Sequence, residues 1–334
     1  MRQYQLDERD GLDRLKLVEK PDPAPGENDI LIRMRAGSLN YRDMVMSRGA
    51  YGSAAPAGLV PLSDGAGEVV AVGSGVTRFK AGDRVCPIFF PHWIDGEADA
   101  SKIVAALGGS VDGVLAEYCV CDEDAAVAVP DYLSFEEAAT LPCAALTAWV
   151  ALFGPRPLQA GQTVLTLGTG GVSVFAIQFA KAFGATVIAT SSSDWKLEAA
   201  RQFGADHLIN YEITPDWEAE VLRLTGGLGV DHVIEVGGGT IAKSMLSCAI
   251  GGQIHMIGAV SGMDKVNPGD LILGCRTVRG FMVGSRADFE AMNKALATHR
   301  IKPAIDRVFD FEAAGDAYRH LESGAHIGKV VVRI

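Results

Sequence analysis

A glycine-rich turn between a predicted strand and a predicted helix constrains this chain more than any other stretch of its sequence. Thr163–Leu167 is a run of apolar and β-branched residues typical of a buried parallel strand, and Gly168-Thr-Gly-Gly-Val-Ser173 follows it directly. Apolar residues then recur at helical spacing as far as Gly184, and Thr186–Thr190 predicts a second strand. Such a unit presents backbone N–H groups and a helix N-terminus to a pyrophosphate, so it predicts a dinucleotide site.

The turn departs from the strict G-x-G-x-x-G pattern because Ser173 stands where the third glycine would be. The helix must therefore pack on the strand with a hydroxymethyl group between them. A glycine pattern alone is weak evidence, but here it lies between a strand and a helix at the spacing that the mechanism needs. The residues expected at the pyrophosphate are those of the turn: Gly168, Thr169, Gly170, Gly171 and Val172.

The end of the second predicted strand favours NADPH over NADH. An NAD enzyme carries an acidic residue about 20 residues beyond the first glycine, where it accepts the ribose hydroxyls. This chain has Thr190-Ser-Ser-Ser193 there, and hydroxyls followed by a lysine suit a 2′-phosphate. Asp194 would repel that phosphate if it turned inward, but we expect it to cap the helix Trp195–Phe203. The side chains expected at the ribose and adenine are Ser191, Ser192, Lys196 and Tyr211.

The composition is that of a soluble enzyme rather than a nucleic-acid or membrane protein. The 334 residues are 48% hydrophobic and 21% charged, with a net charge of −11 and no basic block. The N-terminus lacks the apolar region of a signal peptide, and no run of about 18 apolar residues occurs. We therefore expect a cytoplasmic protein with no nucleic acid or membrane as partner.

The order of predicted elements indicates an α/β chain in two parts. Leu15–Val18 and Asp29–Ala36 begin a series of strands without long helices between them, which is typical of a mostly β domain. From Thr163 onward strands and helices alternate, which predicts a doubly wound parallel sheet with its ligand at the carboxyl ends of the strands. Three residues at later strand ends, Gly237, Ile257 and Ala259, are accordingly expected at the cofactor, although glycine-rich turns are also common for geometry alone.

At this point the chain resembles the medium-chain dehydrogenase/reductase superfamily, and within it the zinc-independent quinone and enoyl reductases. The segments that carry the resemblance span the chain in order: Leu39-Asn-Tyr-Arg-Asp43, Pro61–Gly67, Phe79–Val85, Leu141–Trp149, the Gly168 turn, Gly204–Tyr211 and Gly328-Lys-Val-Val331. The resemblance implies a GroES-like domain over residues 1–128, a Rossmann domain over 129–285 and a C-terminal return to the first domain over 286–334.

The same resemblance argues against a metal site. Members with catalytic zinc bind it through a cysteine, a histidine and a second cysteine, and the first two positions fall at Asn40 and Ser63 here. Only Cys143 remains, and one soft ligand cannot form the three-ligand site of a catalytic zinc. We expect no metal, with an unusual ligand set that includes His92 or Asp64 as the open alternative.

The resemblance also implies roles for residues outside the glycine turn. Thr147, Phe281 and Val283 inherit positions near the nicotinamide, and the strand Val278–Gly284 would extend the sheet across a homodimer. Lys329 reaches the cofactor or fixes the C-terminus to the first domain. The expected catalytic donors are Asn40 and Tyr51, of which Tyr51 could instead be a packed loop aromatic.

The chemistry that fits is hydride delivery from NADPH to a quinone or an α,β-unsaturated carbonyl, a small hydrophobic substrate. The oxygen that becomes negative lies one conjugated system away from the attacked carbon, so hydrogen-bond donors can stabilise it without a Lewis acid. Aromatic residues in Phe89–Val111 are expected to shape the substrate pocket. Two alternatives stay open: zinc-dependent oxidation of an alcohol, and a nucleotide-binding protein with little turnover.

Overall fold

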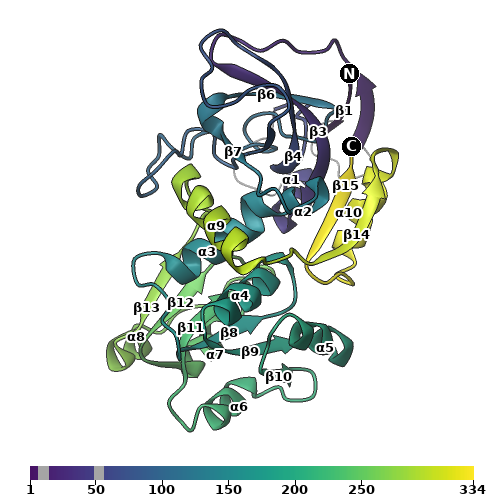
Figure 1. Cartoon of the computed structure of the whole chain (residues 1–334). Coiled ribbons are helices and arrows are strands. Elements are labelled where there is room, and N and C mark those ends of the chain that lie inside the picture. The colour runs from purple at the N-terminus through teal and green to yellow at the C-terminus, as the bar shows by residue number, and fades with distance from the viewer. Residues whose placement is uncertain (7–14, 49–55) are drawn as a thin grey trace. The chain divides into compact units, whose positions relative to one another are not determined.

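The computed structural model describes residues 1–6, 15–48 and 56–334 of the chain. These residues form two compact units. Unit 1 comprises Met1–Leu146 and Val283–Ile334, and unit 2 comprises Thr147–Met282. The chain therefore leaves unit 1 once and returns to it once, so both the purple and the yellow ends of the ribbon in Figure 1 belong to unit 1.

Unit 1 is mostly β. Its main sheet has seven strands in the order β14-β15-β3-β4-β5-β7, with β6 beside β3, and a separate antiparallel pair joins β1 to β2. Alternate residues of β3, Ile30, Ile32 and Met34, are buried, which is the period of a strand with one face on the core. The strands are β1 (Arg2–Leu6), β2 (Leu15–Glu19), β3 (Asp29–Leu39), β4 (Asp64–Val72), β5 (Arg84–Pro87), β6 (Tyr118–Asp122), β7 (Ala126–Ala128), β14 (Ile305–Asp310) and β15 (Lys329–Arg333).

The C-terminal segment completes the sheet of unit 1. β15 pairs antiparallel with β3, with Val330 opposite Leu39, and parallel with β14. Residues before the crossing to unit 2 also pack here, because Arg84 Nη2 donates to Leu133 O at 2.6 Å. The helices and single turns of this unit are α1 (Tyr41–Ser47), η2 (Glu123–Ala125), α2 (Phe135–Ala138), the π-helical turn η3 (Leu141–Ala145), α9 (Arg286–His299), η4 (Phe311–Ala313) and α10 (Ala314–Glu322).

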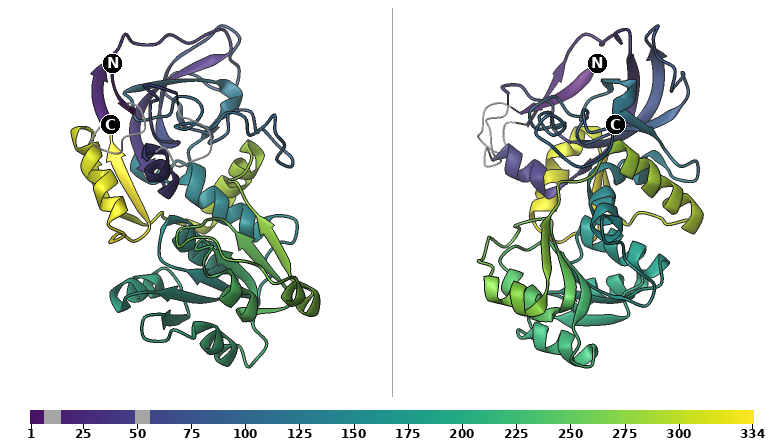
Figure 2. Two further views of the ribbon diagram at one scale, coloured as in Figure 1. Left: turned by 180° about the vertical axis from the view of Figure 1, so that it is seen from behind. Right: turned by 90° about the vertical axis from the view of Figure 1, so that its left-hand side faces the viewer.

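Unit 2 is a six-stranded parallel sheet in the order β10-β9-β8-β11-β12-β13. The views in Figure 2 show helices of this unit on both faces of the sheet. The doubly wound sheet expected from the sequence, together with the mostly β unit, is confirmed. Its elements are α3 (Leu146–Phe153), β8 (Thr163–Leu167), α4 (Gly171–Ala182), β9 (Thr186–Ser191), α5 (Asp194–Gln202), β10 (His207–Asn210), α6 (Trp217–Leu224), β11 (Val230–Glu235), α7 (Ile241–Ser247), β12 (Cys248–Met256), α8 (Pro268–Gly274) and β13 (Thr277–Gly280).

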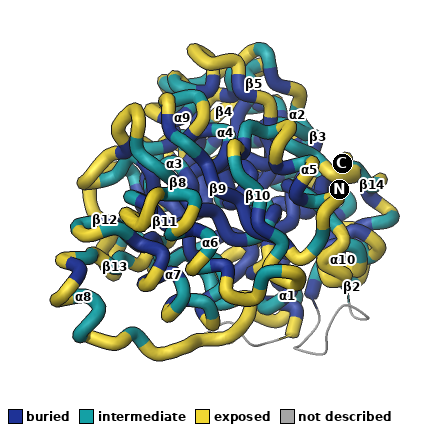
Figure 3. The backbone as a smooth tube through the Cα atoms, turned by 90° about the horizontal axis from the view of Figure 1, so that it is seen from below, coloured by how far each residue is buried: buried dark blue, intermediate teal, exposed yellow. Residues whose placement is uncertain are grey.

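Each unit has a hydrophobic core of its own. In unit 2 the central strands are buried along nearly their whole length, and β9 is drawn dark blue in Figure 3. Such continuous burial is what a parallel sheet covered on both faces requires. In unit 1 the core forms where β3 packs against the C-terminal return, and it includes the fully buried Tyr318 of α10. Among the described residues no helix has the length and apolarity that crossing a membrane would need.

Candidate active site

The glycine turn of unit 2 leaves open space at the end of β8. Gly168 has a φ of +71°, and its N–H donates to Thr190 O at 2.9 Å, so the turn is fixed to the neighbouring strand. A Cβ placed on Gly168 or on Gly170 would meet no atom within 4 Å. Packing within the protein therefore does not explain Gly170, whereas close approach of a ligand to the backbone would.

Helix α4 starts at this turn and directs its first N–H groups toward the open space. Gly171 and Val172 are its first two residues, and the first N–H groups of a helix have no partner within the helix. Thr169 in the turn is buried. The arrangement fits a pyrophosphate, which accepts hydrogen bonds from such N–H groups and is favoured by the helix dipole.

Ser173 packs between α4 and β8 at the position where the strict pattern has its third glycine. The side chain is buried, and its Oγ donates to Leu167 O, the last residue of β8, at 2.7 Å. The hydroxymethyl group thus connects the first turn of α4 to the strand rather than separating them. A serine replaces the glycine because the group it adds satisfies a backbone carbonyl at the strand end.

The ribose end of the site contains the serines expected from the sequence. Ser191 ends β9 and is buried, while Ser192 is exposed and Lys196 lies on α5 with its Nζ 5.4 Å from the centre of the Trp195 ring. Tyr211 is partly exposed, and its N–H donates to Ser191 O at 3.0 Å. The structure therefore brings Ser191 and Tyr211 to the ends of neighbouring strands.

The start of α5 differs from the prediction made for Asp194. Helix α5 begins at Asp194 with Ser193 as its N-cap residue, so the prediction that Asp194 caps the helix is wrong. Asp194 instead accepts a hydrogen bond from Asn210 Nδ2 at 2.7 Å, so its carboxylate lies at the end of β10. The Ser193 hydroxyl is buried and has no hydrogen-bond partner among the described residues. Sequence reasoning did not select Ser193, although it belongs to the serine run that suggested a phosphate.

The glycines after β11 have a structural explanation. Buried Glu235 accepts hydrogen bonds from the N–H groups of Gly237 and Gly238, at 2.8 and 3.0 Å. A Cβ on Gly238 would lie 2.2 Å from Gly262 O and 2.9 Å from Ala259 Cα, so the loop after β12 needs glycine there. Gly237, Ile257 and Ala259 are thus brought together at the carboxyl edge of the sheet, but the Gly237 N–H already has a partner within the protein.

The residues expected at the nicotinamide are divided between the units. Thr147 is buried on α3 in unit 2, and the Phe281 ring packs 5.4 Å from His255 in the same unit. Val283 belongs to unit 1 and has a φ of +63°. The strand predicted to reach Gly284 ends at Gly280, because the left-handed backbone at Val283 cannot continue a strand.

Unit 1 brings Lys329 together with Asn40, Ser63 and Asp64, three residues that sequence reasoning considered as possible zinc-ligand positions. Lys329 Nζ donates to Leu39 O at 2.6 Å and to Asn40 Oδ1 at 2.5 Å. Asn40 Nδ2 lies 3.4 Å from Ser63 Oγ, and Ser63 Oγ donates to Asp64 Oδ1 at 2.6 Å. Asp64 Oδ2 accepts from the Cys143 N–H at 3.0 Å. We call Asn40, Ser63, Asp64 and Lys329 the Asn40 network.

The Asn40 network is buried and its charges compensate one another. Burial raises the pKa of Asp64, and the Lys329 ammonium opposes that rise. Burial also raises the pKa of Asp43, the N3 residue of α1, to about 6, despite the opposing charge of Arg42. The Asp43 carboxylate accepts from the Asn40 N–H at 2.7 Å and so completes a capping box at the start of α1. The Cys143 thiol has a pKa raised by burial, which disfavours its thiolate form.

These residues do not fit a catalytic zinc. Within the described residues, no three His, Cys, Asp or Glu side chains are grouped so that they could hold a metal. Asn40 Oδ1, the one oxygen at the position of the first cysteine ligand, already faces the ammonium of Lys329. A second cation close to that ammonium would be repelled in a buried site.

The sequence also made predictions for Tyr51 and for the aromatic residues of Phe89–Val111. Tyr51 lies outside the described residues. The aromatic residues expected to shape the pocket are packed inside unit 1, where the Phe89 and Phe90 ring centres are 4.6 Å apart and Arg42 lies 4.5 Å over Phe89. His92, next to these rings, is exposed.

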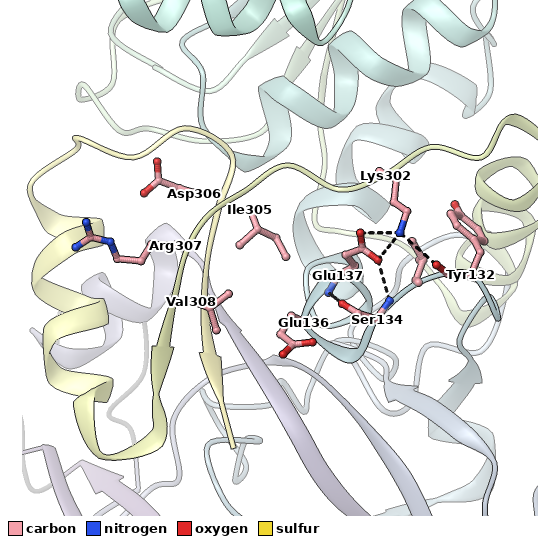
Figure 4. Close-up of a pocket in the computed structure, with 10 residues that line it drawn as sticks. Tyr132, Ser134, Glu136, Glu137, Lys302, Ile305, Asp306, Arg307 and Val308 are labelled. Carbon is pink, nitrogen blue, oxygen red and sulfur yellow. Dashed lines mark hydrogen bonds and ion pairs between the residues drawn. The ribbon is translucent and has the colours of Figure 1, made fainter.

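A surface hollow of about 610 Å³ lies between α2 and β14 of unit 1 (Figure 4), and its carboxylates and Lys302 have partners. Lys302 forms hydrogen bonds with both carboxylate oxygens of Glu137 at 2.9 Å, and Glu136 accepts from Arg333. Asp306 pairs with His320 at 2.6 Å. The hollow therefore presents no unpaired catalytic group and is separate from the Asn40 network.

Comparison with known proteins agrees with the two-part organisation. The family model described as the alcohol dehydrogenase GroES-like domain matches residues 26–131, and the model described as zinc-binding dehydrogenase matches residues 171–298. A zinc-type alcohol dehydrogenase-like protein of Schizosaccharomyces pombe is 45% identical over 340 residues, covering 98% of this chain and 97% of its own.

Solved structures resemble the chain over its whole length. A crystal structure of an NAD-dependent alcohol dehydrogenase matches with a TM-score of 0.92 and 34% identity, covering 100% of both chains. The Escherichia coli quinone oxidoreductase complexed with NADPH matches with a TM-score of 0.85 and 26% identity, also covering 100% of both chains. The relatives thus include alcohol dehydrogenases and quinone oxidoreductases, and both nicotinamide cofactors.

Proposed function

This chain belongs to the medium-chain dehydrogenase/reductase superfamily, and we propose that it is an NADPH-dependent reductase of quinones or α,β-unsaturated carbonyls that works without zinc. Membership makes it an oxidoreductase with a nicotinamide cofactor. The observation that supports the finer proposal is the Asn40 network, in which an amide stands at a position where zinc-dependent relatives have a ligand and an ammonium lies beside that amide.

Unit 2 holds most of the residues proposed to bind the cofactor, and unit 1 holds Asn40 and the segment of Tyr51. Bound NADPH supplies a hydride, which adds to the β-carbon of an enone or to a quinone carbon. The electron pair of the conjugated system moves to the carbonyl oxygen. An enone then takes a proton at the α-carbon and becomes the saturated ketone, whereas a quinone takes one proton and becomes the hydroquinone. We assign the N–H groups of Asn40 to the oxygen that becomes negative, and Tyr51 to proton donation or substrate orientation.

Two features of unit 2 support NADPH as the cofactor. No acidic side chain stands among Thr190–Ser193, where an NAD enzyme would hold its ribose hydroxyls, and Asp194 is engaged by Asn210. The buried Ser193 hydroxyl lacks a partner in the part of the chain that the structure describes, and it could donate to a phosphate oxygen. Initial rates with NADPH and NADH at equal concentrations test the assignment. We expect a clear preference for NADPH, and equal turnover with the two cofactors would contradict the assignment.

An acceptor panel tests the reaction class. NADPH oxidation is measured with a simple quinone, an enone and an aldehyde under the same conditions. Turnover of the quinone or the enone is expected, because both spread the new negative charge over a conjugated system. Turnover of the aldehyde alone would favour the alcohol dehydrogenase reading that the names of several relatives suggest.

We also propose that the chain is a homodimer that pairs through unit 2. β13 is an edge strand of the parallel sheet, and an edge strand can pair with a strand of a second copy. Four large apolar side chains on β12, α8 or the loop between them are highly exposed, and such exposure marks surfaces that another protein covers. They are Ile250, Met263, Ile272 and Leu273.

A further inference from the structure

We propose that Lys329 is a positioning residue that fixes the orientation of the Asn40 side-chain amide, so that Asn40 presents N–H groups rather than its oxygen to the substrate. The inference rests on the proposed function, because it assigns the residue that makes Asn40 a donor. It differs from the expectation that Lys329 binds the cofactor or only fixes the C-terminus.

The hydrogen bonds around Asn40 allow only one orientation of the amide. A lysine ammonium can donate but cannot accept, so the atom of Asn40 that lies 2.5 Å from Lys329 Nζ must be the oxygen. The nitrogen then faces Ser63 Oγ, which can accept because its own hydrogen is directed to Asp64 at 2.6 Å. Exchanging the amide oxygen and nitrogen would place N–H groups against the ammonium, which has no acceptor.

The donors along the Asn40 network are aligned in one direction, from the Lys329 cation to the Asp64 anion. Each hydrogen bond polarises the next, which strengthens aligned chains. Nδ2 carries two hydrogens: one is directed to Ser63 Oγ, and a hydrogen bond from the Asn40 side chain also opposes the rise in the pKa of Asp64. Asn40 is 8% exposed, whereas Ser63 and Asp64 are completely buried and Lys329 is 3% exposed. Asn40 is therefore the member of the network most accessible to a substrate.

The backbone around Lys329 supports a positioning role. Gly328 has a φ of +69°, and a Cβ there would lie 2.4 Å from Ala304 O, so only glycine allows the chain to turn into β15 at this point. Lys329 N–H donates to Ala304 O at 2.9 Å, and the following residue, Val330, pairs with Leu39. Two sheet contacts thus hold the Lys329 backbone immediately beside the Leu39–Asn40 segment.

A double-mutant cycle with Asn40→Ala and Lys329→Met tests the inference. Steady-state rates are measured for an enone or quinone with saturating NADPH, and the NADPH Kd is measured by fluorescence. We expect Lys329→Met alone to lower kcat about ten- to hundredfold, since misplacing a transition-state donor costs that order. In the Asn40→Ala background the same change should lower kcat less than about threefold, because its target is gone. The NADPH Kd should stay within about twofold.

Three results would overturn the inference. Equal losses of kcat in both backgrounds would show that Lys329 does not act through Asn40. A raised NADPH Kd with unchanged kcat would make Lys329 a cofactor-binding residue. A wild-type enzyme that reduces none of the acceptors would overturn the proposed function and the inference together, whereas an active wild type with an additive cycle would overturn only the inference.

Two further variants keep the test independent of folding. Lys302→Met is the matched control, because Lys302 is a paired lysine of the same C-terminal segment outside the Asn40 network, and its kcat should equal that of the wild type. Ser63→Ala removes the contact at the other end of the Asn40 amide without removing a buried charge. It should lower kcat about threefold, and only when Asn40 is present. An equal effect with and without Asn40 would contradict the network.

Discussion

Asn40 shows that a side chain's chemistry depends on what faces it. From sequence it was a candidate donor because it replaced a metal ligand, but an asparagine offers an oxygen as readily as an N–H. Lys329 removes that ambiguity, and it is 289 residues away in the chain. Spacing could not reveal such a pair, since the sheet register between β15 and β3 creates it.

Tyr51 is the other expected donor, and its test is chemical. Tyr51→Phe removes only the hydroxyl, so we expect turnover to fall at least about tenfold, the lower part of the range for a general acid, with little change in NADPH affinity. Steady-state kinetics on the best acceptor measure the effect. Tyr41→Phe is the matched control, because Tyr41 is exposed on α1. Unchanged turnover of Tyr51→Phe would remove this tyrosine from the mechanism.

At the scale of the element, local signals predicted the parts of unit 2 well. The strand at Thr163–Leu167 matches the structure to the residue, and the helix predicted over Trp195–Phe203 is shifted by one residue to Asp194–Gln202. β1 was missed because its alternation, with polar Arg2 and Gln5, is short. The start of α9 was overlooked although Ser285 and Asp288 form a capping box, a pattern visible in sequence.

Some element details depend on tertiary contacts that no local pattern carries. The chain enters α3 through the π-helical turn η3, where the Cys143 N–H donates to Asp64. The glycine run after β11 was read as a cofactor contact, but Glu235 and the loop at Gly262 explain its glycines. In both places a buried carboxylate decides the local structure.

Glu235 is predicted to be essential for the stability of unit 2. Its carboxylate accepts from the Gly237 and Gly238 N–H groups and from the hydroxyls of Thr240 and Ser244. Glu235→Ala leaves these donors without partners and should lower the free energy of unfolding by at least about 3 kcal/mol. Glu235→Gln keeps one acceptor oxygen and should cost about 1 kcal/mol.

Denaturant unfolding followed by fluorescence measures both Glu235 variants. The exposed Glu198, which pairs with Arg201 on α5, supplies the control: Glu198→Ala should stay within about 0.5 kcal/mol of the wild type. A Glu235→Ala protein as stable as this control would show that the four hydrogen bonds contribute little.

A buried histidine pair makes the stability of unit 2 depend on pH. His232 Nδ1 and His255 Nε2 are 3.0 Å apart, and His232 Nε2 lies 3.2 Å from Gln162 Oε1. Burial lowers the pKa of both histidines, so the folded protein stays unprotonated while the unfolded chain binds protons below about pH 6.5. Stability is therefore complete above that pH and falls as the pH decreases, by about 2 kcal/mol per histidine at pH 5.

Urea unfolding at pH 7 and pH 5 tests this dependence. His255→Phe should reduce the loss of stability between the two pH values, because one of the two buried titrating groups is removed and the ring still packs beside Phe281. The exposed His92 provides the control, and His92→Gln should leave the loss unchanged. An equal loss in all three proteins would assign the pH dependence to other groups.

At the scale of the whole molecule, the sequence anticipated the two parts. The resemblance implied a C-terminal return to the first part, but not the strand pairing by which that return joins the sheet of unit 1. Seven segments in the correct order identified the superfamily, since each carries a local motif. That β14 and β15 extend the sheet of unit 1 follows from strand pairing between the two ends of the chain. Pairing at such separation leaves no periodic signal in the sequence.

The proposed homodimer predicts an effect of charge on the exposed face of α8. Leu273 is 82% exposed, and Leu273→Asp should raise the dimer dissociation constant at least about tenfold, because two copies lose a buried leucine. Light scattering after size-exclusion chromatography measures the mass across a dilution series. Leu228→Asp is the matched control, since Leu228 is 78% exposed but follows α6. A monomeric wild type would contradict the proposal.

The central claim is that the chain reduces a conjugated acceptor without a metal, and one measurement tests it most directly. NADPH oxidation with the best quinone or enone is followed with and without a strong chelator, on protein whose zinc content has been determined. The account predicts substoichiometric zinc and the same rate in both conditions, because Asn40 and Ser63 stand at two of the ligand positions and the Lys329 ammonium faces the Asn40 oxygen. Stoichiometric zinc with activity abolished by the chelator would contradict it.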